Sequence, residues 1–544
     1  MKRYLTILII LFVIPISCSD EDFRLDEKTD PQSLSLDEGD LGDYFLNIQV
    51  QFSKFFEEYH QFNRELARYT TMTGSRLYEN AFLPTAFDVG WRIAYTNILV
   101  NTETIISLGT EKNQIHLVGA SRVIKTLTFL TLVDMFGDIP FSEALKGSES
   151  SNPKLDSSES IYQALISELE TAISELNDSS SVSLPNDKDL IYDGTAENWI
   201  KAANSLLIKI YVQQRKVVSG TSSKIDAIVN SGNYIQSKAE DFEFKYSTST
   251  SPDSRHFLYA SNYITGASDY LGNGFMNMLL NDKSIRDPRL RYYMIRQQTT
   301  NTTDVSEKDC LSSVKPNHYS ESDPFCELIE GYWGRDHGDD AGIPPDTRAR
   351  TTWGVYPAGG AFDADQGVAV TSSSGGKGAG ISPILLSSYV DFYLAEAALT
   401  MNTSGDPQVL LQSAINKSFE KVTTFNTRFG VNIPDDFAAN QSEFETYTNE
   451  VITNYGNTSS VDEKLSIMSK EFYLAAFGNG FEAYNLYRRT GYPKLQLSLA
   501  ASPGSFIRTF KYPSDLVNRN INVSAKDDQT TKVFWDNEDN DFVK

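Results

Sequence analysis

Apolar residues recur at steps of three and four along much of the chain, which predicts amphipathic helices. The clearest stripe contains Ile161, Leu165 and Leu169, and Ser157 or Ser158 before it is suited to cap the start of a helix. The same periodicity predicts helices over residues 40–66, 85–107, 114–136, 158–176, 196–212, 384–401, 407–422, 442–455 and 461–477. Successive helical pairs of this size favour hairpins like those of tetratricopeptide proteins, although no strict repeat of that consensus is present.

The helical pattern is interrupted between about residues 218 and 382, where Gly, Ser, Pro, Asp and Asn become frequent. Runs such as 371–378 are too rich in serine and glycine to form a helix. We therefore expect a mainly α-helical fold, with a helical frame over about 39–217 and 383–544 and a large loop-rich insertion over about 218–382. A long aperiodic segment in a compact protein is usually functional, so the ligand side is expected there.

The last predicted helix is followed by a recognisable end signal. Arg488 and Arg489 suit the negative end of a helix, Gly491 suits a left-handed cap and Pro493 prevents continuation. We expect this helix to begin near Val461. The two arginines are interpreted as structural, in preference to an anion-binding patch.

The N-terminus has the organisation of an export signal. Lys2 and Arg3 precede an apolar run over residues 4–16, and Cys18 follows. A cysteine at the cleavage point is typical of bacterial lipoproteins, so residues 1–17 are predicted to be a lipoprotein signal peptide and Cys18 the lipidation site. A signal peptide without lipidation is the alternative, because Pro15 departs from the usual lipoprotein motif.

Residues 18–38 are polar and acidic, which predicts a flexible, lipidated tether ahead of a single domain over 39–544. The stretch Ser19-Asp20-Glu21-Asp22 resembles the acidic tag of lipoproteins that reach the cell surface in some Gram-negative bacteria. The expected location is therefore the outer membrane, lipid-anchored and facing outward.

Charge and motif content narrow the function further. The formal net charge of −24 disfavours nucleic acid and anionic lipid surfaces, which need basic neutralisation. The sequence has no phosphate-binding loop, no nucleophile elbow and no paired zinc ligands, so no cofactor is expected. Nothing after residue 17 resembles a membrane-spanning run, so contact with the membrane is expected through the anchor alone.

Two of the three cysteines remain once Cys18 is set aside. Cys310 and Cys326 form an even pair in an exported chain, which predicts a disulfide worth about 3 kcal/mol in the chain-entropy model. Two unpaired thiols are the alternative. A metal site is disfavoured because two thiols do not complete a tetrahedral shell.

Five segments in the same order resemble the SusD/RagB family of surface lipoproteins, and more closely its SusD-like branch, associated with starch and glycan uptake. They are residues 128–145 (TFLTLVDMFGDIPFSEAL), 189–211 (DLIYDGTAENWIKAANSLLIKIY), 287–292 (DPRLRY), 386–399 (LSSYVDFYLAEAAL) and 467–495 (IMSKEFYLAAFGNGFEAYNLYRRTGYPKL). The resemblance implies one helical domain built on four tetratricopeptide-like units. It also implies a binding protein, not an enzyme, that passes glycans to a SusC-like, TonB-dependent outer-membrane barrel; a RagB-like peptide-binding role is the alternative.

Aromatic residues with nearby polar groups supply the candidate ligand site, because sugars stack on rings while their hydroxyls need fixed donors and acceptors. They concentrate in residues 331–363, with a second group further upstream from which Trp91 is assigned to the core and Tyr78 to a possible rim. The candidate glycan-binding residues are Trp333, Trp353, Tyr332, Tyr356, Arg335, Asp336 and Tyr78. The alternative is that these rings fill the underside of a long loop.

Carboxylates in the same segment allow two further hypotheses. Asp339 and Asp340 are weak candidates for calcium, which prefers oxygen ligands, although their spacing does not match an EF-hand loop. Glu396 as a catalytic acid would need a second carboxylate across a sugar ring, so it is expected to be a paired core residue. The acidic charge weakly favours a neutral glycan as ligand.

Overall fold

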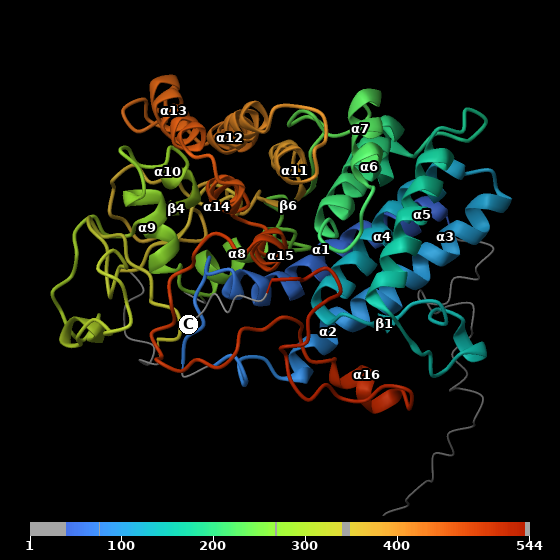
Figure 1. Ribbon diagram of the computed structural model, residues 1–544, viewed down its shortest axis with the longest axis horizontal. Helices are drawn as coiled ribbons and strands as arrows, with labels where there is room; N and C mark the ends of the chain where they lie inside the picture. The colour runs from blue at the N-terminus through green and yellow to red at the C-terminus, as the bar shows by residue number, and fades with distance from the viewer. Residues whose placement is uncertain (1–39, 75–76, 267–268, 340–348, 539–544) are drawn as a thin grey trace, which may run out of the picture.

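The computed structural model describes residues 40–74, 77–266, 269–339, 349–538 and shows a mainly helical protein (Figure 1). Its long helices pack as neighbours in sequence, with α4 on α5 and α11 on α12. The helices are α1 (Leu41–Leu66), α2 (Asp88–Arg92), α3 (Val100–Glu111), α4 (Ile115–Phe136), α5 (Ser158–Leu176), α6 (Ala196–Gln213), α7 (Ser222–Ser231), α8 (Phe257–Tyr259), α9 (Asn273–Asn281), α10 (Leu290–Tyr293), α11 (Ser387–Thr400), α12 (Pro407–Thr423), α13 (Gln441–Asn457), α14 (Val461–Ala475), α15 (Gly480–Thr490) and α16 (Ser514–Arg519).

Strands are short and occur as three antiparallel pairs in the described part of the chain. These pairs are β1 (Ile139–Pro140) with β2 (Leu155–Asp156), β3 (Phe242–Lys245) with β6 (Ile381–Leu385), and β4 (Met294–Ile295) with β5 (Thr352–Trp353). The β3–β6 pair joins residues 242–245 to residues 381–385, so that the chain between these two strands returns to its starting point. Within residues 218–382 the structure adds the short helices α7 to α10, which the sequence pattern did not predict.

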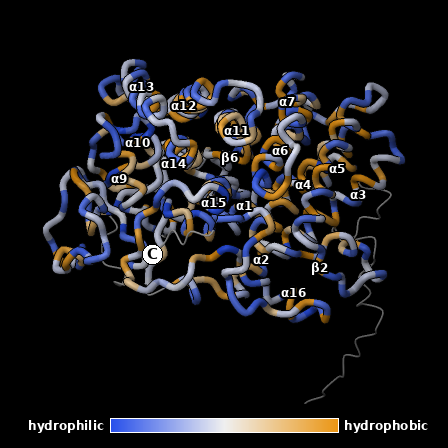
Figure 2. The backbone as a smooth tube through the Cα atoms, viewed as in Figure 1, coloured by the Kyte–Doolittle hydropathy of each residue, from blue (hydrophilic) through white to orange (hydrophobic). Residues whose placement is uncertain are grey.

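The predicted helices are confirmed apart from one, described below, and caps at Asp40 and Ser157 follow sequence signals. Asp40 caps α1 by accepting from the Gly42 N–H at 2.9 Å, and Ser157 caps α5 by accepting from the Ser160 N–H at 3.3 Å. The stripe on α5 is buried, and α5 packs against α4 and α6. Figure 2 shows many apolar positions along these helices.

One predicted helix is wrong in its extent. The helix expected from Val461 to the arginine pair is two helices, because α14 ends at Ala475 and α15 starts at Gly480. Gly478 has a φ of 100°, which is unfavourable for residues with a side chain, and Asn479 caps α15 by accepting from the Glu482 N–H. The predicted left-handed C-cap at Gly491 is confirmed, with a φ of 80°.

Helix α4 is long and apolar enough to cross a membrane by length and composition. However, 72% of its most apolar window is buried inside the protein, and it contacts α3 and α5 along its length. The structure therefore explains its apolar character by its position as a core helix.

Helix α15 carries buried charges that connect the two halves of the helical frame. Arg489 donates to both carboxylate oxygens of Glu396 on α11, at 2.9 and 3.0 Å, and Arg215 donates to the same carboxylate at 2.8 Å. Burial alone raises the pKa of Glu396, but the positive charges of Arg215 and Arg489 outweigh it and hold this pKa below its usual value. The interpretation of Glu396 and Arg489 as structural is confirmed.

We expect Glu396→Gln to lower the free energy of unfolding by about 3–5 kcal/mol, because two buried guanidinium groups lose their counter-charge. Urea denaturation of the variant beside wild type measures this change. Glu420→Gln is the matched control, because Glu420 pairs with Lys238 at 2.8 Å on the surface and exposed pairs contribute little. Equal destabilisation by the two substitutions would contradict the structural role of Glu396.

Candidate functional site

The aromatic platform predicted within residues 331–363 is not on the surface. Trp333 is 2% exposed and Trp353 is 1% exposed, so neither ring presents a face for stacking. The other candidates in this set are also buried: Tyr332, Tyr356, Arg335, Asp336 and Tyr78. The structure therefore matches the alternative interpretation, in which the rings fill the underside of the insertion.

Trp353 is enclosed by groups from distant parts of the chain. Its ring stacks on Phe477 with centroids 4.7 Å apart, and its indole N–H donates to Asp269 at 3.3 Å. Tyr356 packs edge-on against Phe425 at 5.2 Å. Both rings thus hold the insertion against the frame.

Cations cover the remaining candidate rings. The Lys308 ammonium lies 4.9 Å from the centroid of Trp333, and the Arg296 guanidinium lies 4.5 Å from that of Tyr332. Arg335 covers the ring of Tyr270 at 4.4 Å. These cation–π contacts satisfy the charged residues inside the insertion and leave them unavailable to a ligand in this arrangement.

Tyr78, expected at a rim, is fully buried. Its hydroxyl bonds to the Arg68 guanidinium and lies 3.4 Å from Nε2 of His337, while its ring packs on Phe506. It connects the loop after α1 to the insertion.

Asp336 organises the loop that contains the predicted cysteine pair. Its carboxylate accepts from the Cys326 N–H at 2.8 Å, from Gln496 at 2.8 Å and from Asn273 at 3.3 Å. Cys310 and Cys326 are disulfide-bonded in the structure, with Cα atoms 5.5 Å apart. The loop is therefore held both by the disulfide and by the hydrogen bonds to Asp336.

The remaining candidates are placed as follows. Asp339 lies 3.9 Å from Arg335, whereas Asp340 and Cys18 lie outside the described residues. Among the residues that the structure describes, no group of three or more His, Cys, Asp or Glu side chains is placed to hold a metal ion.

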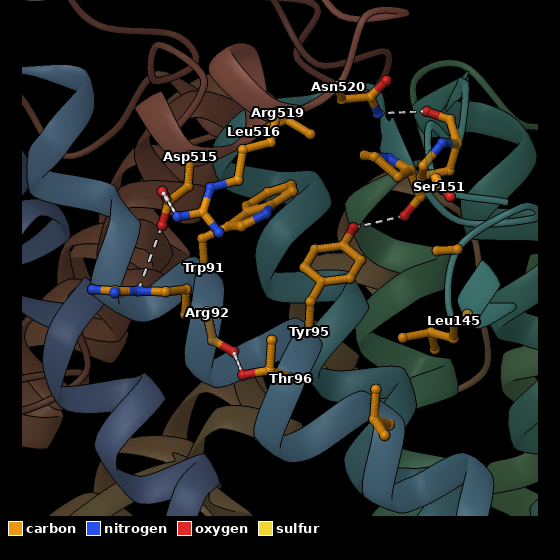
Figure 3. A pocket seen from close by; sticks show the side chains of 15 residues that line it. Trp91, Arg92, Tyr95, Thr96, Leu145, Ser151, Asp515, Leu516, Arg519 and Asn520 are labelled. Carbon is orange, nitrogen blue, oxygen red and sulfur yellow. Dashed lines mark hydrogen bonds and ion pairs between the residues drawn. The ribbon is translucent and has the colours of Figure 1, made fainter. Parts of the chain in front are cut away.

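A pocket of about 540 Å³ lies instead between N-terminal helices and the C-terminal helix α16 (Figure 3), within the size range of small-molecule sites. Three segments distant in sequence form its walls. They are the continuous helix from α2 through a π-helical segment (Ile93–Leu99) into α3, the loop between β1 and β2, and α16.

Two aromatic rings form the floor of the pocket. Trp91 and Tyr95 are four residues apart and share one helix face, with ring centroids 4.6 Å apart and planes inclined by 35°. Trp91 also packs edge-on against Phe136 in the core, at 5.7 Å, and Tyr95 donates to the Pro140 carbonyl at 2.6 Å. Trp91 is 7% exposed, so its assignment to the core is confirmed, and it is also among the residues that line the pocket.

Charged groups on α2 and α16 form the rim of the pocket. Asp515 lies 3.5 Å from the Arg92 guanidinium and 3.3 Å from that of Arg519, so one carboxylate positions two arginines (Figure 3). The arginine side chains are 56% and 75% exposed, which keeps their remaining donors accessible. The pocket therefore combines a partly exposed aromatic ring, Tyr95, with accessible hydrogen-bond donors on its rim.

The walls are held together by hydrogen bonds at both ends of α16. At its start, the Asp515 N–H donates to Asp88 on α2 at 2.9 Å. At its end, Asn520 donates to the Pro153 carbonyl at 2.7 Å, and the Ile521 N–H donates to Asn152 at 3.1 Å. The shape of the pocket is thus maintained by hydrogen bonds between its walls.

The sequence interpretation missed this site. The rings at Trp91 and Tyr95 carried a signal in their four-residue spacing, but that spacing is equally typical of core packing. The residues Arg519 and Asn520 lie in a short polar segment with no motif, so nothing in the sequence related them to α2.

Two family descriptions match the chain. One, "Starch-binding associating with outer membrane", matches residues 38–323, and the other, "Susd and RagB outer membrane lipoprotein", matches residues 366–536. The first alone spans more than half of the chain. No curated protein sequence matches the chain significantly.

Solved structures share the fold. A SusD homologue from Bacteroides uniformis is 18% identical, with 92% of this chain and 99% of that chain covered and a TM-score of 0.63. A chitin-binding SusD homologue from Flavobacterium johnsoniae is 20% identical, with 91% and 97% covered and a TM-score of 0.61. At these identities the likeness establishes the SusD-like helical fold and not the ligand.

Asp336 makes folding stability depend on pH. Burial raises its pKa to about 6, against hydrogen bonds from Cys326, Gln496 and Asn273 that lower it. Between about pH 4 and pH 6 the folded carboxyl therefore binds a proton that the unfolded chain releases, so stability falls as pH rises, by about 3 kcal/mol across this window.

Asp336→Asn removes this pH dependence, because an amide does not titrate. Its NH2 group also faces one of the N–H donors whose hydrogen bond the carboxylate accepted in wild type. We expect the variant to have a lower free energy of unfolding than wild type at pH 4. The difference between the two free energies should narrow by about 3 kcal/mol towards pH 7, because only wild type loses stability as pH rises. Urea denaturation at several pH values measures the difference. A constant difference across the window would contradict a raised pKa for Asp336.

Proposed function

The chain belongs to the SusD/RagB family of outer-membrane lipoproteins, and from that premise we propose that it binds oligo- or polysaccharide at the cell surface and delivers it to a SusC-like, TonB-dependent transporter. The pocket between α2, the β1–β2 loop and α16 is the proposed glycan site. Cys18 is the proposed lipid anchor.

The proposal is supported by a pocket that places a partly exposed ring, Tyr95, beside a charged rim. Sugars present apolar faces that stack on rings such as Tyr95, and hydroxyls that bond to charged donors such as Arg92 and Arg519. The chitin-binding relative from Flavobacterium johnsoniae, which shares the fold, supports a saccharide as the class of ligand.

The pocket's charges favour binding over hydrolysis. Asp515 is the single carboxylate among the described residues that line it, whereas glycoside hydrolysis ordinarily uses two facing carboxyl groups. Because Asp515 offsets the rim arginines and the whole chain carries −24, a neutral glycan is the proposed ligand.

We expect Tyr95→Ala and Arg519→Ala each to weaken glycan binding about tenfold, since each removes a contact worth about 1–2 kcal/mol. Affinity electrophoresis of protein lacking residues 1–18 against neutral and acidic polysaccharides measures this effect. The matched controls are Tyr44→Ala, a half-buried tyrosine elsewhere, and Arg286→Ala, which removes an exposed arginine paired with Glu330.

Retardation by a neutral glycan that both pocket variants lose and both controls keep supports the proposal. Unchanged retardation of Tyr95→Ala and Arg519→Ala would contradict the assigned site, and retardation only by a polyanion such as alginate would contradict the neutral ligand. Binding of peptides without any glycan would favour the RagB-like alternative.

A further inference from the structure

A second cavity, of about 550 Å³, lies between α9 and two extended segments of chain near residues 322–324 and 494–496. It shares no lining residue with the pocket at α2 and α16. Figure 1 shows α9 and α16 on different sides of the molecule. The two cavities are therefore independent in position as well as in composition.

The lining of this second pocket is hydrophilic. Asn277 and Asn281 lie one turn apart on α9, and the Asn281 amide donates to the Asn277 carbonyl oxygen at 2.8 Å. This bond leaves the amide N–H groups of Asn277 and the carbonyl oxygen of Asn281 for other partners. No aromatic ring is among the described residues that line it.

Two charges in the lining have no ion-pair partner among the described residues, namely Asp323 and Lys494. The Asp323 carboxylate accepts one backbone N–H, from Ser320 at 2.8 Å. By contrast, Asp282 in the same lining is neutralised, with Lys470 at 2.8 Å and Lys283 at 3.0 Å. The cavity is thus surrounded by a hydrogen-bond acceptor (Asp323), a cationic donor (Lys494) and two amides (Asn277 and Asn281). This combination suits hydroxyl groups, which both donate and accept hydrogen bonds.

The wall that carries Asp323 is held rigidly. The Cys310–Cys326 disulfide closes its loop, and Gln496 donates to the Pro324 carbonyl at 2.8 Å. Lys315 donates to the Asp323 backbone carbonyl at 2.7 Å. A polar pocket that is already ordered requires little further ordering on binding, which favours weakly held ligands such as sugars.

We propose that this cavity is a second, ring-free saccharide site that binds the hydroxyl groups of a neutral sugar through Asn277, Asn281, Asp323 and Lys494. The inference rests on the proposed glycan-binding function and extends it. A long glycan bound at both sites gains avidity from the second contact.

The test is isothermal titration calorimetry of the full chain in detergent with maltohexaose, cellohexaose and chitohexaose. The variants are Asn277→Ala/Asp323→Ala for the second site and Tyr95→Ala/Arg519→Ala for the first. Asn454→Ala/Asp435→Ala is the matched control, because both residues are exposed and line neither pocket. Cys310→Ser/Cys326→Ser tests the disulfide-held wall separately.

At least one hexasaccharide is expected to bind at two sites in wild type. Two variants, Asn277→Ala/Asp323→Ala and Cys310→Ser/Cys326→Ser, should weaken binding at the second site about tenfold or more and leave the first site unchanged. Tyr95→Ala/Arg519→Ala should weaken binding at the first site and leave the second unchanged. A single site that Asn277→Ala/Asp323→Ala leaves unchanged overturns the second site and leaves the proposed function standing. No binding of any hexasaccharide overturns both.

Discussion

Buried charged side chains on α15 hold the helical frame together. Glu482, Arg488 and Arg489 are all within the core, where an unpaired charge would be very costly. Each must therefore find its partner on another element. Glu482 pairs with Lys209 on α6, and Arg489 pairs with Glu396 on α11, so α15 joins the early and late helices of the frame.

The same helix also attaches the C-terminal tail that completes the first pocket. Arg488 donates to the Arg508 carbonyl at 2.6 Å and to the Asp134 carbonyl on α4 at 2.7 Å, so one side chain holds the tail against an N-terminal helix. Beyond this point the Phe510 N–H donates to the Met135 carbonyl at 2.8 Å. The tail then reaches α2 and contributes α16, which places the rim arginine Arg519 near Trp91.

This arrangement separates the roles of the two aromatic populations. Rings in the insertion, such as Trp333 and Trp353, are covered by cations or stacked on core rings, and they stabilise the loop-rich half. Rings on α2 and its π-helical continuation, Trp91 and Tyr95, contact the core on one side and a cavity on the other. The proposed site therefore relies on Tyr95, which stays partly exposed at the cavity, and not on the segment where rings are most frequent.

The helical frame could be predicted from the sequence because its signals are local. The stripe at Ile161, Leu165 and Leu169 and the cap at Ser157 each act within a few residues. The break between α14 and α15 does have a local signal, the turn sequence Gly478-Asn479-Gly480, which the assignment of one helix from Val461 to the arginine pair overlooked.

The candidate sites depended on contacts that local patterns do not contain. Trp353 is buried by Phe477, more than a hundred residues away, and the pocket requires α16 to meet α2 across most of the chain. The predicted cysteine pair is an exception, because an even number of cysteines in an exported chain is itself informative. It is joined in the structure, and it holds the wall of the second cavity.

Hydrogen exchange of the protein, with and without the neutral glycan that retards it most, tests whether the first pocket is the binding site. We expect slower amide exchange with glycan in three segments, residues 91–100, 140–153 and 514–522, which are far apart in sequence and meet at the first pocket. Protection confined to residues 331–339 and 349–363, with no change in these three segments, would contradict it.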